Sequence, residues 1–243
     1  MAARKPPEAW FWSHDIRADQ IKHVVTPGMH LMRLSSYGSG DRRRFAALVY
    51  KEPGADRAYA VDLDAAALDA QLRDTGARPV AITASADEAN PRFSVVLQHG
   101  PGALCSARVD LDEAGVRALL DDQHAIADIA TYVAGGARKY AVIVEERSAS
   151  SWFLTGLTPH QLDARLLELD ASLVRLRAYV EGGQQRLVAV AERSRGVGWA
   201  WYTDLDGDAV ARNLENNAAY PIDLDAIRDA RGTRFSVVMV RDR

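Results

Sequence analysis

The chain has 243 residues, of which 48% are hydrophobic and 26% are charged, and its formal net charge is -3. Such a composition is typical of a globular protein with a sizeable core, and the acidic balance argues against a dedicated nucleic-acid binder, which carries a basic face. The single cysteine, Cys105, excludes an intrachain disulfide. No stretch approaches the ~18 apolar residues of a membrane span, and residues 1–15 lack the apolar core of a signal peptide. We therefore expect a cytoplasmic protein without a nucleic-acid or membrane partner.

One short motif, a basic residue followed by a large apolar residue and a run rich in Val and Ala, recurs five times. The large residue stands at positions 45, 93, 140, 187 and 235, so that the steps are 48, 47, 47 and 48 residues. A fixed period of this length indicates a repeat architecture.

Each repeat begins with two predicted strands. Alternation of apolar and polar residues predicts a half-buried first strand in the ranges 32–37, 80–85, 127–132, 174–179 and 222–227. A turn rich in Gly, Asp and Asn follows. The recurring motif itself forms the second strand, at 44–50, 92–97, 139–144, 186–191 and 234–239. Because this strand is apolar on both faces, we expect it to lie at the centre of its sheet.

A third strand and a helix complete the repeat. The third strand is predicted at 58–63, 106–111, 152–157 and 200–205. It ends before a residue suited to cap a helix N-terminus, namely Asp64, Asp112, Thr158 or Asp206. Apolar residues then follow at a spacing that places them on one face of a helix, which can cover the sheet.

The two ends of the chain look complementary. Residues 10–16 resemble a third strand, whereas residues 219–243 supply only a first and a second strand. We therefore predict an α+β fold of five strand-strand-strand-helix repeats closed into a propeller-like ring, which would leave no exposed sheet edges. The predicted units are 29–76, 77–124, 125–170, 171–218 and a split unit of 219–243 plus 9–28, after a disordered leader at 1–8. An open solenoid is the alternative.

The same pattern resembles the bacterial tandem repeat domain, which is also the N-terminal, non-catalytic part of fungal polyglycine hydrolases. The resemblance covers nearly all of residues 9–243. It implies a repeat fold without catalytic residues, because the chemistry of those hydrolases belongs to a separate domain with a Ser-x-x-Lys motif. None of the lysines here has a serine three positions before it.

Positions that vary from repeat to repeat on a shared face are candidates for a binding site. On the first strand these positions hold Arg33, Asp128, Arg175, Arg177, Asp223 and Asp225, and on the third strand they include Arg108, Trp152 and Tyr202. If both faces point to a central axis, they would line a cavity with the mixture of charges and aromatic rings expected of a ligand site. The alternative is that the arginines and aspartates pair between units.

Other candidates have a structural interpretation. The basic residues before the second strands, Arg44, Arg92, Lys139, Arg186 and Arg234, could hold an anion, but their strict repetition favours bonds to a neighbouring turn or to terminal carbonyl groups. Trp10, Trp12, Trp199 and Trp201 are expected to fill the core. No histidines or cysteines stand at metal-ligand spacing, so no metal or cofactor is predicted.

Two functions remain open. The first is a non-catalytic toroid that binds a small molecule or a protein. The second is a stand-alone enzyme that acts on a small anionic molecule, with Asp128, Asp223 or His14 as acid or base and arginines as anchors. A buried carboxylate beside the cavity would favour the enzyme, because desolvation can bring its pKa into a catalytic range. Charges fully paired between units would favour binding.

Overall fold

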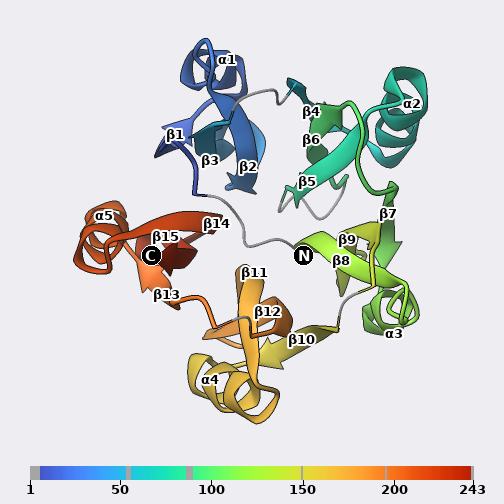
Figure 1. Ribbon diagram of the computed structural model, residues 1–243. Helices are drawn as coiled ribbons and strands as arrows, with labels where there is room; N and C mark the ends of the chain where they lie inside the picture. Colours follow the sequence, from blue (N-terminus) through green and yellow to red (C-terminus); the bar gives the residue numbers. More distant parts are fainter. Residues whose placement is uncertain (1–5, 53–55, 86–89, 149, 195, 242–243) are drawn as a thin grey trace.

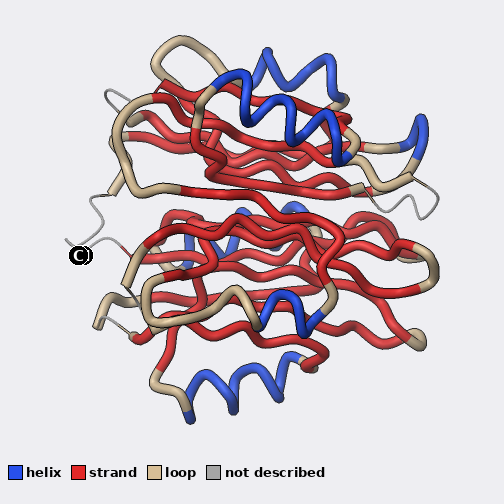
Figure 2. Tube along the Cα trace, turned by 90° about the vertical axis from the view of Figure 1, so that its right-hand side faces the viewer, coloured by secondary structure: helices blue, strands red, loops and turns tan. Residues whose placement is uncertain are grey.

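The computed structural model describes residues 6–52, 56–85, 90–148, 150–194 and 196–241. These residues form five three-stranded antiparallel sheets, each with one helix, and Figure 1 shows the five units side by side about a common centre. The predicted α+β fold of repeated sheet-and-helix units is confirmed. Figure 2 shows the same arrangement from the side, with helices on the outside.

Every sheet has the same strand order. The strand nearest the centre, called the inner strand, is β2 (His30–Tyr37), β5 (Arg78–Ala84), β8 (His124–Ala134), β11 (Ala171–Glu181) or β14 (Ala219–Asp229). The central strand is β3 (Arg44–Lys51), β6 (Phe93–His99), β9 (Ala137–Glu146), β12 (Gln184–Arg193) or β15 (Gly232–Arg241). The outer strand is β1 (Ala9–Ile16), β4 (Asp56–Leu63), β7 (Cys105–Leu111), β10 (Ser151–Leu157) or β13 (Trp199–Leu205). The recurring motif is thus the central strand, as its two apolar faces predicted.

The predicted boundaries of the units are wrong. In each sheet the outer strand comes first in the chain and pairs with the central strand that follows it, so β1 pairs with β3 and β13 pairs with β15. Residues 9–28 therefore complete the first unit and not the last, and no unit is split. The five sheets lie within 9–51, 56–99, 105–146, 151–193 and 199–241. A periodic sequence looks the same whichever element is taken as its start, so the period alone did not reveal this phase.

The helices of the last four units begin at the predicted caps. The five helices are α1 (Ile21–Val24), α2 (Ala65–Thr75), α3 (Glu113–Arg117), α4 (Pro159–Glu168) and α5 (Gly207–Asn216), and they lie at the periphery (Figure 1). The side chains of Asp64, Asp112, Thr158 and Asp206 each accept a hydrogen bond from the third backbone N–H beyond them. The first unit has no such cap, and a short 3-10 helix (Ala18–Gln20) precedes α1. A second 3-10 helix (Gly40–Arg42) lies between β2 and β3.

A bulge recurs at the end of every outer strand. Its residue has a positive φ, and it is Asp15, Asp62, Asp110, Gly156 or Asp204 in the five units. The pairing register with the central strand shifts at this point in all five sheets. Only Gly, Asn and Asp adopt this left-handed backbone readily, which explains the recurring Asp-Leu-Asp and Gly-Leu-Thr sequences. The bulge turns the chain from the sheet into the helix cap.

The core lies where the sheet faces of neighbouring units pack against each other. Side chains of the central strands such as Phe45, Val95 and Val238 are fully buried. One apolar cluster combines Met32 and Tyr50 of the first unit with Leu176 of the fourth and Tyr220 of the fifth. The first and fifth units are therefore in contact, although they lie at opposite ends of the chain.

The expected leader falls largely outside the described residues, because residues 1–5 are not among them. Residues 6–8 precede β1 without forming a helix or strand. In this stretch Glu8 lies 3.3 Å from the ammonium group of Lys51, measured between Oε2 and Nζ.

Candidate functional site

Side chains at the centre satisfy backbone amides of the neighbouring unit. An inner strand is a sheet edge, so every second N–H points away from its own sheet and needs another partner. The N–H groups of Ser36, Ile82, Leu176, Ala178 and Ala226 donate to side-chain oxygens of the next unit at 2.8 to 3.0 Å. The acceptors are Thr83, Asp128, Asp223, Asp225 and Ser35, in that order. This arrangement gives the buried carboxylates a structural role.

Arginines form ion pairs with two of these carboxylates, those of Asp128 and Asp223. Nη2 of Arg177 lies 2.7 Å from Oδ1 of Asp128, and its Nη1 lies 2.7 Å from Oδ2 of Asp223. Nε of Arg175 lies 3.1 Å from Oδ1 of Asp128, and Nε of Arg33 lies 3.8 Å from Oδ1 of Asp223. We call Arg33, Asp128, Arg175, Arg177 and Asp223 the central charge cluster. All five are buried, and the contacts join the first, third, fourth and fifth units.

The cluster favours the charged forms of Asp223 and Arg177. Burial opposes ionisation of Asp223, but the nearby Arg177, Arg175 and Arg33 outweigh it and lower the pKa of this carboxyl group. For Arg177, burial acts to lower the pKa, and the charges of the surrounding aspartates outweigh it and raise the pKa. The predicted pairing of charges between units is thus present, in a fully buried setting.

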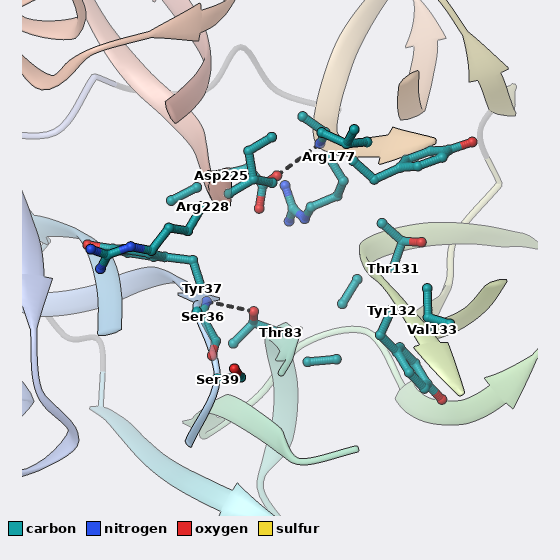
Figure 3. Close-up of a pocket in the computed structure, with 18 of the residues that line it drawn as sticks. Ser36, Tyr37, Ser39, Thr83, Thr131, Tyr132, Val133, Arg177, Asp225 and Arg228 are labelled. Atoms are coloured by element: carbon teal, nitrogen blue, oxygen red, sulfur yellow. Dashed lines mark hydrogen bonds between the residues drawn. The ribbon is translucent and has the colours of Figure 1, made fainter. Parts of the chain in front are cut away.

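A pocket of about 360 Å³ opens at one end of the inner strands (Figure 3). Its lining comes from all five inner strands: Ser36, Ala84, Thr131, Ala178 and Ala226 occupy the same register position in the five sheets. Arg177 and Asp225 also line it. The pocket therefore lies where the five units converge, directly beside the central charge cluster.

Asp225 is a carboxylate that borders this pocket. It accepts hydrogen bonds from the hydroxyl group of Ser35 at 2.8 Å and from the backbone N–H of Ala178 at 3.0 Å. Burial raises its pKa to about 6, because the favourable charge of Arg177 and these hydrogen bonds only partly offset desolvation. A carboxyl group of this kind changes its charge close to neutral pH.

Arginines stand at the rim. Arg138 lies with its guanidinium carbon 3.4 Å from the ring centroid of Tyr179, and its Nη1 donates to the hydroxyl group of Thr131 at 3.2 Å. Arg228 lines the pocket from the fifth unit beside Tyr37 (Figure 3). Its side chain has no ion pair or hydrogen bond with the residues that the structure describes. Together with hydroxyl groups such as that of Thr83, the rim offers positive charge and hydrogen-bond donors.

The structure brings some of the predicted ligand residues together and separates others. Arg33, Arg175 and Arg177 meet in the central charge cluster, where aspartates engage them. Arg108, Trp152 and Tyr202 lie instead on the outer strands β7, β10 and β13, and none of them lines the pocket. Variation between repeats is common to both strands and predicts one shared site, but only the inner strands reach the centre.

The three residues considered as acid or base lie in different surroundings. Asp128 and Asp223 are 1% exposed and are engaged by arginines and by backbone amides. His14 lies on the exposed part of β1, where its ring stacks on Trp12 with 5.2 Å between centroids. It also contacts Phe235 of the fifth unit. None of the three lines the pocket.

The repeated basic residues do not gather at the centre. Arg44, Lys139 and Arg234 lie 3.5 to 3.9 Å from the bulge aspartates of their own units, and Arg92 lies 3.7 Å from the cap Asp64. Arg186, whose unit has Gly156 at the bulge, donates to Gln184 instead. These basic residues thus have structural contacts, as expected. Most of them contact carboxylates of their own unit, and some also donate to backbone carbonyl groups, as Lys139 does to Asp110.

The tryptophans are partly buried and pack between units. Trp10 and Trp12 of β1 lie against the cluster that contains Val210 and Leu214 of α5, and Trp199 and Trp201 lie against the cluster that contains Leu162 and Leu166 of α4. Nε1 of Trp201 also donates to Asp163 of α4. The core role predicted for them is confirmed, although it joins neighbouring units and is not confined to one sheet and its helix.

Sequence reasoning missed the two rim arginines. Arg138 and Arg228 lie near the hairpin turns that follow the inner strands, where charged residues are common on any protein surface. Their position in the repeat could have identified them. Counting residues from the large apolar residue of each central strand places Arg138 and Arg228 near the pocket end of their sheets.

Comparisons with known proteins add no assignment. No protein-family model matches the chain, and no curated protein matches it either.

Among the described residues, no helix is long and apolar enough to cross a membrane, and no group of three or more His, Cys, Asp or Glu side chains could hold a metal ion.

Proposed function

We propose that the five units form a closed, propeller-like toroid. The contacts between the first and fifth units support it: the backbone N–H of Ala226 donates to Ser35, whose hydroxyl group donates to Asp225. Tyr50 also donates to the carbonyl group of Pro221. Closure of this kind satisfies edge strands that an open array would expose.

We further propose that this toroid is a binding module for a small molecule, which occupies the pocket at the end of the inner strands. The observation that carries the proposal is the joint lining of one pocket of about 360 Å³ by all five units. This volume lies in the range of small-molecule sites, and hydroxyl, amide and guanidinium groups converge on it. The charged residues below it are paired and buried, which suits a rigid floor better than a reacting group.

One observation favours the alternative of an enzyme. Asp225 borders the pocket, and its raised pKa of about 6 would let it exchange a proton near neutral pH. In that case Asp225 would act as the acid or base and Arg138 or Arg228 would anchor an anionic substrate. Asp128, Asp223 and His14 are not part of this proposal, because they do not line the pocket.

Native mass spectrometry of the freshly purified protein tests the binding proposal. A bound compound that denaturation releases, and that the Arg228→Ala variant retains less well, is the expected result. The control is Arg231→Ala, which removes an exposed arginine engaged by Asp204 and Asp229 outside the pocket lining. Equal retention by all three proteins would place the compound elsewhere and contradict the proposal.

A further inference from the structure

Two backbone amides at the pocket lack, among the residues that the structure describes, the side-chain acceptor that the equivalent amides of the other units have. Ala84 and Thr131 occupy the same register position as Ser36, Ala178 and Ala226, whose N–H groups donate to a side chain of the next unit. By this register the N–H groups of Ala84 and Thr131 also point away from their sheets. No side-chain oxygen of a described residue accepts a hydrogen bond from either one.

The cause lies in the next unit. The side chains that accept the equivalent bonds are Ser35, Thr83 and Asp225. At the corresponding position the third unit has Ala130 and the fourth has Arg177, and neither side chain can accept a hydrogen bond. Two adjacent units thus present donors to the pocket where the other three are satisfied from within the protein.

The surroundings of these donors are electropositive. Arg138 stands beside Thr131 and donates to its hydroxyl group, and the guanidinium group of Arg177 lines the same pocket. Asp225, the one carboxylate among the described residues of the lining, lies across the pocket from Thr131 (Figure 3). Amides open to the pocket next to arginines form a site for an oxyanion, because charge-assisted hydrogen bonds are the stronger kind.

We propose that the pocket binds a small molecule through one carboxylate group, whose oxygens accept hydrogen bonds from the backbone amides of Ala84 and Thr131 and are balanced by Arg138. This inference rests on the proposed binding function and deepens it. A carboxylate has two oxygens for two amides and a single charge, which suits a pocket that also holds Asp225. A dianionic phosphate would be repelled more strongly by that residue.

The experiment compares benzoate with benzamide, its neutral analogue of the same shape, by ¹H–¹⁵N NMR at pH 7 and constant ionic strength. Benzoate is expected to move the amide signals of Ala84 and Thr131 downfield in a saturable manner and to bind at least about tenfold more tightly than benzamide, a factor that one charged hydrogen bond supplies. Inorganic phosphate serves as a second anion and is expected to bind more weakly.

Two variants sharpen the test. Ala130→Ser places in the third unit the hydroxyl group that Ser35 provides in the first, so it should engage the N–H of Ala84 and weaken benzoate binding about tenfold. Arg138→Gln should weaken it by a similar factor, and Arg231→Gln, outside the pocket, should leave it unchanged. The amide spectra of the variants report directly whether each has folded.

The outcomes separate the two proposals. If benzamide moves the pocket amides as strongly as benzoate does, or if Ala130→Ser leaves benzoate binding unchanged, the carboxylate assignment is wrong and the binding function stands. If phosphate binds more tightly than benzoate, the ligand class is wrong. If benzoate, benzamide and phosphate at millimolar concentration move no pocket amide and native mass spectrometry finds no bound compound, both proposals fail.

Discussion

Replacing Arg177 by Met should destabilise the protein strongly. Its guanidinium group lies 2.7 Å from both Asp128 and Asp223, and all three side chains are buried. Methionine fills a similar volume, so the main loss is charge compensation, which costs about 3–5 kcal/mol when a buried pair is broken. For a protein of this size, that corresponds to a fall in melting temperature of about 6–20 °C.

Urea denaturation followed by circular dichroism measures this loss, and Arg231→Met is the matched control. Arg231 also contacts two carboxylates, those of Asp204 and Asp229, but its side chain is 53% exposed, so its removal should leave the unfolding midpoint almost unchanged. Adding Asp223→Asn to Arg177→Met should recover part of the stability, because it removes one uncompensated charge. A loss below about 1 kcal/mol for Arg177→Met would refute the view that charge pairing holds the units together.

Two further predictions concern pH and the bulge. The pKa of Asp225 is about 6 in the folded protein and about 3.9 in the unfolded chain, so the free energy of unfolding should fall by up to about 3 kcal/mol as pH rises through this window. The Asp225→Asn variant should therefore flatten a plot of urea midpoint against pH between about pH 4 and 6. An unchanged slope would contradict the burial of this carboxyl group. Gly156 has a φ of 75°, and a Cβ at this position would meet no atom within 4 Å. Gly156→Val should therefore lower the free energy of unfolding, measured in urea, by about 1–2 kcal/mol from backbone strain alone. Gly156→Asp, which introduces the residue of the other four bulges, should cost clearly less, and equal losses would show that the strain argument is wrong.

Much of the local structure followed from the sequence because it depends on neighbouring residues. The apolar run from Phe45 to Tyr50 predicted a central strand, and the Asp or Thr after each outer strand predicted a helix cap. Both signals act over a few residues, where propensity and hydrogen-bonding geometry decide the outcome.

The phase of the repeat and the composition of the site did not follow. Whether residues 10–16 pair with the strand at 44–51 or with the one at 234–241 depends on tertiary contacts, and the same motif stands at both places. Arg177 lines the pocket and Arg108 does not, because only the edge of the sheet that carries Arg177 faces the centre. Alternation along one strand cannot distinguish the two edges.

The contact between Ser35 and Asp225 also bears on the order in which the molecule folds. These two residues are 190 positions apart, whereas the hydrogen bond from Ser36 to Thr83, which joins the first and second units, spans 47. Loop-closure entropy grows with the logarithm of the loop length, so joining the first and fifth units costs only about 1 kcal/mol more than joining adjacent ones. Yet this contact must wait until the chain between has assembled, because shorter loops close sooner. We expect the fifth unit to dock last, and the seam between the two ends to be the part of the molecule that opens first under force or denaturant.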